Sequence, residues 1–574
     1  EEINRIATRD AATNDQHLTL ALPDDGDRAS GAVDDGVTDR AELPHHGHAG
    51  EFTQPFESAA YSRELSQSSS GRLQRAERGL YTPVTSVTSL RPGSADVTDN
   101  TRNTPPGDSG DHERLPYPDE EQGELHVGEE IPHHLVQVLA VELDPGVARG
   151  VEVDGPALVE RYGHRTDGLY GYRVGIDPTG SQALWECLPR DLFDIFVATC
   201  ARPPEHFNVL TESMTQTASI PLSNDPEAIA SERSVSRATL RQVLFSGFDA
   251  LEFGKEFTHY ESHSDGTVTA FFADGTSATG DLLVGADGTR SAVRAQFLPE
   301  ATIRDTGITA IATKTPLTDE TRALLSPEVA NGLSLIFADK GMLGILHVME
   351  FPWDADGTPK DTRFADQIRA WPDLAFDTTR DYINLAIWSS HEHFPAGTAD
   401  LRGGELIKVA LDATATWDER FRRLFELADP ASAFPLRIAT SDPVPAWKPT
   451  NITLLGDAVH TMTPGQGVGA NTALRDAALL SRELIKAHTK TKSLGDAVAD
   501  YEAEMLPYGT ARVAASLDSN GTSAGDPLYK PGLAGRTALF VTRSYFSLTS
   551  RIPALRRKFL RELETHRAPD LSES

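Results

Sequence analysis

The chain has 574 residues, of which 39% are hydrophobic, and it carries a formal net charge of -32 at pH 7. This length is enough for more than one domain and a large core. The acidic balance argues against a general nucleic-acid binder, because such proteins present a basic face that neutralises phosphates. We therefore expect no nucleic-acid partner.

Two cysteines, Cys187 and Cys200, are too few for a disulfide framework and lack the spacing of metal ligands. We expect buried thiols and no metal site. No run approaches the roughly 18 apolar residues that span a bilayer, and the N-terminus lacks a basic segment followed by an apolar one. These features predict a soluble, cytoplasmic protein and argue against a membrane partner.

The first part of the chain, residues 1–130, is rich in Asp, Glu, Ser, Thr, Gly, Pro and His and has no sustained apolar period. Such a segment buries too little surface to offset its ordering entropy, so we predict low-complexity, disordered sequence here. Residues 135–142 then predict a strand and residues 155–162 a short helix. We expect ordered, packed structure from Gly168 onward.

After Gly168, strand-like and helical patterns alternate, and the segment SVSRATLRQVLFSGF predicts a helix capped by Ser236. Arg237 stands at the start of this helix, where an arginine can hold a phosphate, although exposed arginines are commoner. The helical spacing places Arg241 on the same face as Arg237, away from the face of Leu240, Val243 and Leu244. The helical pattern therefore makes Arg237 a candidate ligand residue without deciding the matter.

A small antiparallel meander is predicted over residues 256–275, and an apolar strand over residues 282–284 follows it. The strand stops at a corner that contains Asp287 and Gly288, and a helix is predicted over residues 291–297. An Asp-Gly corner between strand and helix lets the backbone turn tightly beside a ligand, and a plain turn would use the same residues.

The next hundred residues are rich in strands, with a hairpin turn predicted at Lys340-Gly341, and they predict a sheet that could form the wall of a pocket. Residues 405–428 predict one helix. The C-terminal part predicts helices over residues 493–506 and 536–549 and a basic amphipathic helix over residues 551–566. Packing against its own domain is the simpler role for the last helix, and membrane-surface or partner binding is the other.

The most informative stretch begins with a short buried strand that ends at an acidic turn containing Asp457. A loop with three glycines follows, Gly465, Gly467 and Gly469, and helical periodicity starts at Thr472. The glycines allow the backbone to approach a flat or phosphorylated ligand, and the helix start offers N–H groups to negative charge. A strand-loop-helix packing unit would have the same spacing, so spacing alone leaves both interpretations open.

The order of these segments resembles the FAD-dependent monooxygenases of the p-hydroxybenzoate hydroxylase-like type, or group A aromatic ring hydroxylases. The two segments that carry the resemblance are DLLVGADGTRSAVR and ITLLGDAVHTMTPGQGVGANTALRDA. The resemblance implies an α/β (α+β) fold with an incomplete Rossmann-like FAD-binding domain, an inserted, mostly antiparallel substrate-binding sheet and C-terminal helices. The corresponding ranges are 131–302 and 441–490 for the FAD-binding domain, 303–440 for the sheet and 491–574 for the helices.

The resemblance also implies which residues contact the cofactor. Asp287 and Gly288 match a motif credited with contacts to FAD and NAD(P)H, and Asp457 matches an aspartate that binds the ribityl chain. The glycine loop would lie along the isoalloxazine ring, and Arg237 matches an arginine directed at FAD. The full cofactor-binding set is Arg237, Asp287, Gly288, Asp457, Gly465, Gly467, Val468 and Gly469.

The reaction implied by the resemblance is the hydroxylation of an aromatic or polyketide-like small molecule. NADPH or NADH reduces the FAD, molecular oxygen adds to give a flavin hydroperoxide, and the distal oxygen is transferred to the substrate. Substrate-activating residues differ between members of the family, so no catalytic base is predicted. A halogenase is disfavoured because the sequence has no WxWxIP segment.

The sequence departs from the family at its beginning. The family opens with a strand, a GxGxxG motif and a helix that hold the FAD pyrophosphate, and no GxGxxG precedes Gly168 here. An error in the gene model, a decayed protein and an unusual flavoprotein would each explain this, and the abrupt change in sequence character favours the first. Without the unit, we expect weak FAD binding and an exposed sheet edge. A non-catalytic, flavin-deficient remnant and another FAD-dependent oxidoreductase therefore stay open as alternatives.

Overall fold

The computed structural model describes residues 84–88, 157–161, 172–225, 228–246, 251–353, 381–518 and 521–567. All of them belong to one unit, Gly79–Ser574. The strand predicted over residues 135–142 lies outside the described residues. Among the described residues, no helix is long and apolar enough to cross a bilayer.

One layer of the unit is a five-stranded sheet. Its strands are, in spatial order, β17 (Ile452–Leu454), β11 (Leu282–Ala286), β1 (Val84–Thr88), β2 (Ala157–Glu160) and β7 (Leu251–Phe253). β11 pairs in parallel with β17, and β2 with β7, whereas β1 runs antiparallel to both of its neighbours. The residues of β11 and β17 are all buried, which explains why both strands are continuous apolar runs.

The beginning of the chain differs from the predictions at several points. Val84–Thr88 forms β1 within the segment predicted to be largely disordered, whose other residues lie outside the described ones, and ordered structure begins before Gly168. β1 also pairs along β11, so this edge of β11 is covered. The helix predicted over residues 155–162 is the strand β2, because periodicity in so short an apolar run does not separate the two states and pairing with β7 decides.

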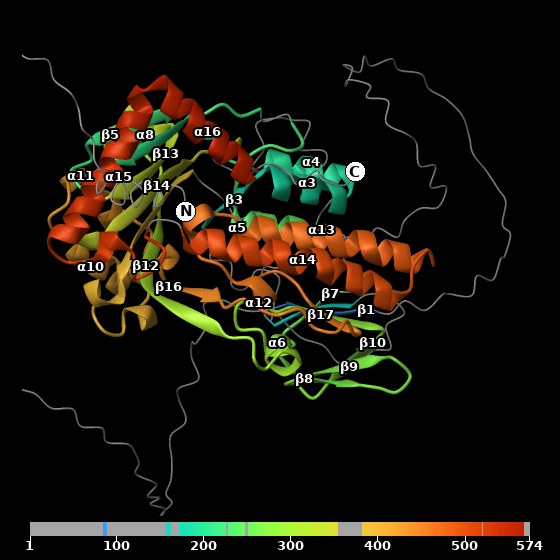
Figure 1. Cartoon of the computed structure of the whole chain (residues 1–574). Helices are drawn as coiled ribbons and strands as arrows, with labels where there is room; N and C mark the ends of the chain where they lie inside the picture. Colours follow the sequence, from blue (N-terminus) through green and yellow to red (C-terminus); the bar gives the residue numbers. More distant parts are fainter. Residues whose placement is uncertain are drawn as a thin grey trace, which may run out of the picture. The chain divides into compact units, whose positions relative to one another are not determined.

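Helices pack against one another and against this sheet. They are α3 (Pro178–Cys187), α4 (Arg190–Ala198), α5 (Arg237–Phe245), α13 (Gly469–His488) and α14 (Leu494–Leu517). Figure 1 shows α13 and α14 side by side over the sheet, and both contribute buried residues to the same core as β11 and β17. A two-stranded ribbon, β3 (Arg173–Ile176) with β6 (Arg233–Ser236), lies next to α13.

A second layer is a seven-stranded sheet. Its order is β16 (Phe434–Ser441), β12 (Ile303–Pro316), β15 (Tyr382–Ser390), β14 (Leu343–Met349), β13 (Gly332–Phe337), β4 (His206–Leu210) and β5 (Gln216–Pro221). All neighbours are antiparallel except β13 and β4, so the expected inserted antiparallel sheet is present. It also includes two strands that precede residue 303. The predicted turn at Lys340-Gly341 is confirmed, with Lys340 at a φ of 62°.

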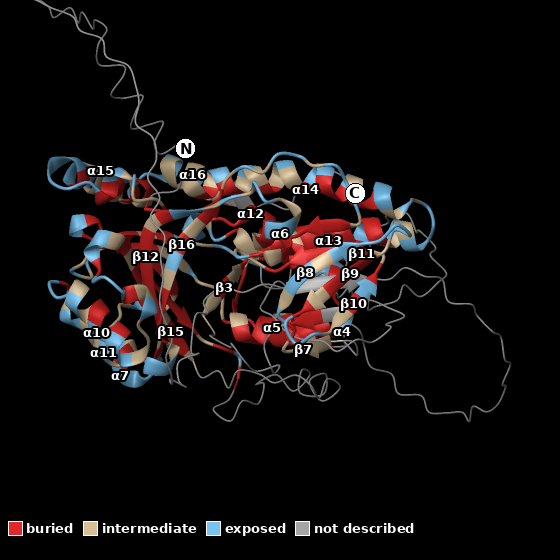
Figure 2. Ribbon diagram, turned by 90° about the horizontal axis from the view of Figure 1, so that it is seen from below, coloured by how far each residue is buried: buried red, intermediate tan, exposed pale blue. Residues whose placement is uncertain are grey.

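The two faces of this sheet have different partners. Alternate residues such as Ile336 pack with α10 (Gly403–Ala413) and α11 (Glu419–Glu426). Others such as Phe337 pack with α15 (Leu533–Arg551) and α16 (Pro553–Arg567). Figure 2 shows the buried strands β12 and β15 beside α10 and α11.

The helix predicted over residues 405–428 is interrupted, which corrects that prediction. α10 ends before Thr414, and the Asp418 side chain accepts a hydrogen bond from Arg420 N at the start of α11. An aspartate that caps a new helix is a stop signal that apolar periodicity does not reveal.

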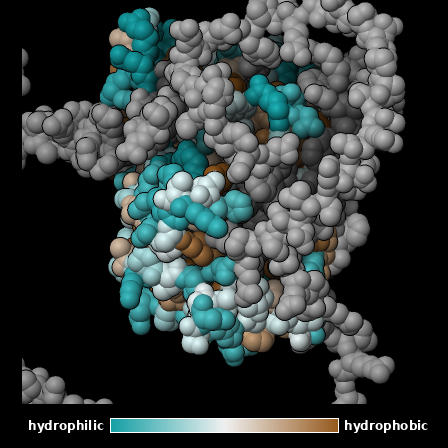
Figure 3. Space-filling view, turned by 90° about the vertical axis from the view of Figure 1, so that its right-hand side faces the viewer, coloured by the Kyte–Doolittle hydropathy of each residue, from teal (hydrophilic) through white to brown (hydrophobic). Residues whose placement is uncertain are grey.

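The meander predicted over residues 256–275 is confirmed as β8 (Phe257–Ser262), β9 (Val268–Phe272) and β10 (Ser277–Gly280). Together the two layers give the mixed α/β fold that the sequence predicts. Figure 3 views the unit from the right-hand side of Figure 1, where the coloured side chains are mainly hydrophilic.

Candidate functional site

Asp287 organises the corner that follows β11. The residue is 2% exposed, and its carboxylate accepts hydrogen bonds from Ser291 Oγ and, at 2.9 Å, from Val293 N. These bonds hold the start of α6 (Ala292–Phe297), and Gly288 turns the chain with a φ of 67°. Burial raises the pKa of Asp287 to about 6. The described contacts of the carboxylate are therefore within the corner itself, and its predicted contact with FAD and NAD(P)H stays a prediction.

The Asp287 corner and the Asp457 turn lie side by side because β11 and β17 are parallel neighbours. Arg294 joins them, since its Nη1 donates to Ala458 O at 2.7 Å and its Nη2 to Thr289 O at 2.8 Å. Thr289 Oγ1 in turn donates to Asp457 Oδ2 at 3.4 Å. Ligands of open α/β sheets bind at this carboxyl edge of parallel strands.

Asp457 begins the short helix α12 (Asp457–His460) after Gly456, whose φ is 61°. The side chain is half-buried. Burial raises its pKa, against the opposing effect of the charges on His460, Arg294 and Arg237. Burial disfavours the charged carboxylate and the nearby cations offset part of that cost, so the half-buried group can accept hydrogen bonds from ligand hydroxyls.

Arg237 is close enough to act on that carboxylate. Its backbone N donates to Tyr172 O at 2.9 Å, and its guanidinium lies 5.6 Å from the centre of the Tyr172 ring. Ser236 is at the predicted N-cap position of α5, but its side chain makes no capping hydrogen bond. The structure thus brings Arg237, the Asp287 corner and Asp457 together.

The glycine loop is the open part of the site. Gly465 and Gly467 are exposed, and nothing lies within 4 Å of where a Cβ on Gly467 would be. Gly467 has a φ of 69°, Val468 is buried at the N-cap position, and Gly469 is the first residue of α13. The helix therefore begins three residues before the predicted Thr472, because a glycine is accommodated in its first turn. Its first backbone N–H groups have no partner within the helix and can face a ligand.

Asn471 fixes the start of α13, and the sequence analysis missed it. Its Oδ1 accepts from Asp177 N at 3.0 Å, and its Nδ2 donates to Gly175 O at 3.0 Å. A Cβ on Gly180 of α3 would come within 2.2 Å of Asn471 Oδ1. The contact between α3 and α13 therefore requires a glycine at position 180. The two partners are almost 300 residues apart in sequence, and no local pattern reveals such a pair.

A buried ion pair supports the Asp457 turn from behind, and the sequence analysis missed this too. His460 Nε2 lies 2.5 Å from Asp476 Oδ2, which also accepts from Gly456 N at 3.2 Å. Burial alone would lower the pKa of His460, but the charge and hydrogen bond of Asp476 raise it. The pair connects α12 to α13. Both residues stand on segments that the sequence analysis had already assigned to the site, and this was the only sequence signal for them.

Glu160 at the end of β2 is a further missed residue. Its carboxylate lies 3.1 Å from Arg241 Nη2, and both side chains are 1% exposed. Arg241 is therefore buried beside a carboxylate that provides its counter-charge, which the helical pattern alone does not reveal. In doubly wound sheets an acidic residue after the second strand binds the adenosine ribose, and Glu160 is the last residue of β2 in this sheet.

His347 is the most unusual polar residue of the seven-stranded sheet. It is 1% exposed, and neither ring nitrogen has a hydrogen-bond partner among the described residues. Burial and the charges of Arg173 and Arg202 hold its pKa well below the ordinary value, so the ring is neutral. Its register partner on the neighbouring strand β15 is Asn384. Asn384 Oδ1 accepts a hydrogen bond from Arg173 N at 3.5 Å. Buried polar atoms without partners are rare in proteins and point to a ligand or a water.

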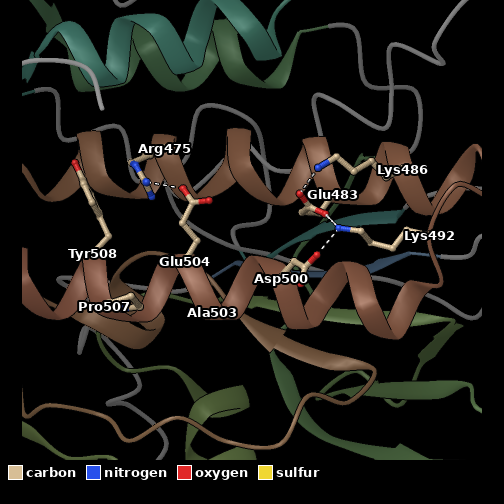
Figure 4. Close-up of a pocket in the computed structure, with 9 residues that line it drawn as sticks. All are labelled: Arg475, Glu483, Lys486, Lys492, Asp500, Ala503, Glu504, Pro507 and Tyr508. Carbon is tan, nitrogen blue, oxygen red and sulfur yellow. Dashed lines mark hydrogen bonds and ion pairs between the residues drawn. The ribbon is translucent and has the colours of Figure 1, made fainter. Parts of the chain in front are cut away.

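A groove of about 650 Å³ between α13 and α14 is a separate feature (Figure 4). Ion pairs cross it, among them Arg475 with Glu504 at 2.6 Å and Lys492 with Asp500 at 2.5 Å. None of the eight predicted cofactor residues lines it. Since its charged groups satisfy one another, we assign the candidate site to the strand edge and not to this groove.

Comparison with known proteins agrees with this site. Residues 437–516, which contain Asp457 and the glycine loop, match the FAD binding domain family. The dual O-methyltransferase/FAD-dependent monooxygenase CTB3 of Cercospora beticola is 31% identical over 61% of this chain and 41% of its own length. The FAD-dependent monooxygenase cctM of Talaromyces islandicus is 28% identical over 53% of this chain and 72% of its own length.

A solved structure gives the same result. The crystal structure of a candidate FAD-containing monooxygenase from Photorhabdus luminescens subsp. laumondii TTO1 matches with a TM-score of 0.53. It is 29% identical, and the match covers 62% of this chain and 89% of that chain. This likeness supports the mixed α/β fold, with the same order of an FAD-binding part and an inserted sheet that the sequence predicts.

The chain is thus similar to FAD-dependent monooxygenases over much of its length, as the resemblance predicted. The match to the FAD binding domain family supports FAD as the cofactor. The chain spans about two fifths of the length of the curated relatives CTB3 and elcB.

Proposed function

We propose that this chain is an FAD-dependent monooxygenase that consumes NADPH or NADH and molecular oxygen and hydroxylates an aromatic or polyketide-like small molecule. One observation carries the proposal. The Asp287 corner and the Asp457 turn are joined through Arg294 and Thr289 at one sheet edge, beside an open glycine loop. This arrangement is suited to a ligand, and the match of residues 437–516 to the FAD binding domain family supports FAD as that ligand.

The residues present fit the ring and ribityl end of FAD. Asp457 offers a half-buried carboxylate to ribityl hydroxyls, and the space beside Gly467 admits a flat ring against the backbone. The start of α13 would stabilise negative charge on the ring, and Glu160 would face the adenosine ribose. When bound, FAD supplies electron transfer from NAD(P)H and the activation of oxygen.

The other residues hold this geometry or meet the substrate. Arg294 fixes the two turns relative to each other, and the His460–Asp476 pair fixes α12 on α13. His347 and Asn384 offer a neutral donor or acceptor and an amide from the seven-stranded sheet. We assign them to the binding of a polar group of the substrate, such as a hydroxyl or carbonyl.

One observation favours a second candidate function, a flavin-deficient remnant of the same fold. The antiparallel strand β1 lies between β11 and β2, and no GxGxxG precedes Gly168 to provide a pyrophosphate-binding turn. The pyrophosphate would then be held by fewer contacts than in a complete site.

The two candidates differ in a simple measurement. The purified chain is incubated with FAD, freed of excess by gel filtration, and its visible spectrum is recorded. Flavin absorption that stays with the protein supports the enzyme, and a colourless protein supports the remnant. NAD(P)H oxidation and product mass are then measured with phenols and aromatic polyketides, comparing the parent with His347→Phe. Oxidation without an oxygenated product would favour another FAD-dependent oxidoreductase.

A further inference from the structure

The helix α15 presents apolar side chains to solvent as well as to the core. Its inner face contributes Phe546, which is 6% exposed, to the packing on the seven-stranded sheet. On the other side, the exposed fractions are 81% for Leu533, 72% for Phe540, 43% for Val541, 48% for Leu548 and 40% for Ile552, just past the helix end. Their spacing of about seven residues places them on one stripe, which we call the α15 stripe.

The charge around the α15 stripe is opposite in sign to that of the protein. Residues 533–567 contain eight Lys or Arg and two Glu, a net charge of +6, in a chain whose net charge is -32. Arg536 and Arg551 are exposed, and helical spacing places them on the same side as the stripe. Arg557 and Arg561 are exposed on α16, which follows in the chain (Figure 1).

We propose that α15 and α16 form a peripheral binding surface for an anionic lipid bilayer. Apolar side chains on one helical stripe, flanked by arginines, are typical of helices that lie in the membrane interface. Basic residues near an anionic surface add an attraction that depends on ionic strength. The surface would not cross the bilayer, in agreement with the absence of a membrane-spanning helix among the described residues.

A second copy of the chain fits this surface less well. In a two-fold symmetric dimer the same patch meets itself, and the exposed arginines that flank the stripe, Arg536, Arg551, Arg557 and Arg561, would then repel their copies. An anionic bilayer instead matches both the apolar stripe and the positive charge. It would also concentrate an apolar substrate near an enzyme of this kind, although the inference does not depend on the proposed function.

The test is co-sedimentation of the full chain with two kinds of vesicle, phosphatidylcholine alone and phosphatidylcholine with about 30% phosphatidylserine. We expect binding to the anionic vesicles that weakens with salt. Leu533→Ser combined with Phe540→Ser should reduce partitioning by about tenfold or more, because both side chains leave water on binding. Trp185→Ser is the matched control, since Trp185 is 36% exposed on α3 outside the surface, and it should bind like the parent.

Three outcomes would overturn the proposal. They are no binding of the parent to anionic vesicles, equal binding to neutral vesicles, and unchanged binding of the double variant. Light scattering of the parent and the double variant tests whether a second copy of the chain covers the surface. If the parent is a dimer and the double variant is a monomer, the surface is assigned to a second copy. Circular dichroism and thermal unfolding confirm that the variants are folded. FAD binding is measured separately, so failure of the flavin site does not affect the result.

Discussion

Asp457 is the side chain that should matter most for holding the flavin. Asp457→Asn keeps the size of the side chain but removes the negative charge that ligand hydroxyls and Arg294 address. Since a hydrogen bond to a charged group contributes about 1.5–3 kcal/mol, we expect FAD to bind roughly ten to a hundredfold more weakly. The measurement is titration of the apoprotein with FAD, followed by flavin fluorescence.

The matched control is Asp400→Asn, at an exposed position in the substrate sheet region. It should leave FAD affinity unchanged. Equal affinity of Asp457→Asn and the parent would remove Asp457 from the cofactor site.

Asp287 should make stability depend on pH. Burial raises its folded pKa from 3.8 to about 6, so the folded protein holds this proton more tightly than the unfolded chain. The sign follows: the contribution to stability is full below pH 3.8 and is lost as the pH rises through 6. A shift of about two units corresponds to roughly 3 kcal/mol.

Urea unfolding between pH 4 and 7 measures this effect. Asp287→Asn should remove the decline, whereas Asp339→Asn at an exposed turn should retain it. If the stability of the parent falls no more between pH 4 and 7 than that of Asp287→Asn, the raised pKa of Asp287 is contradicted.

At the scale of elements, the pairing of α12 with α13 depends on one buried ion pair. Asp476→Asn removes the negative charge that pairs with His460. The buried imidazole then lacks the group that raises its pKa and stabilises its charged form. Breaking such a pair from one side costs about 3–5 kcal/mol. We expect a corresponding loss in the free energy of unfolding, measured with urea at pH 6.

The same pair has a pH signature. Because the folded pKa of His460 is raised, its contribution is full below the unfolded value and declines as the pH rises through the folded value. The stability difference between the parent and Asp476→Asn should therefore shrink at alkaline pH. An Arg482→Gln control removes an exposed ion pair with Glu186 and should cost under about 1 kcal/mol.

Elements with a strong local signal could be predicted from the sequence, and those decided by distant partners could not. The strand β11 and the turn after it were readable because a buried parallel strand is a continuous apolar run that ends at Asp-Gly. The strand β2 was missed because three apolar residues followed by Glu160 fit a helix equally well until β7 pairs with them. The break between α10 and α11 was missed because a capping aspartate interrupts a pattern that otherwise continues.

The candidate site follows the same rule. Asp457 and its glycine loop have a recognisable order along the chain, so they could be named in advance. Asn471, Glu160 and His347 act through partners on other elements. Arg241 follows the same rule, since the carboxylate of Glu160 that pairs with it comes from another element and only the fold brings the two together.

At the scale of the whole molecule, FAD should stabilise the fold, because the site joins elements as far apart in sequence as β2 and α13. A ligand that binds only the folded state stabilises it by about 2.7 kcal/mol at 100 times its Kd. We expect a rise in the thermal unfolding midpoint of the full chain with FAD, and a smaller rise for Asp457→Asn. Riboflavin, which lacks the phosphates and adenosine, separates the contributions of the two halves of the site. No shift with FAD would support the flavin-deficient remnant.

The bond between Asp177 N and Asn471 joins residues 294 positions apart, and β17 completes the edge of β11 only after the whole seven-stranded sheet has been made. A ribosome that adds about 5–20 residues per second needs roughly 15–60 s to cover that distance. During this time the apolar edge of β11 and the inner face of α3 are outside the exit tunnel without their final neighbours. The nascent chain is therefore a natural client for chaperones that shield apolar segments, and slower translation between residues 290 and 450 would lengthen its exposure.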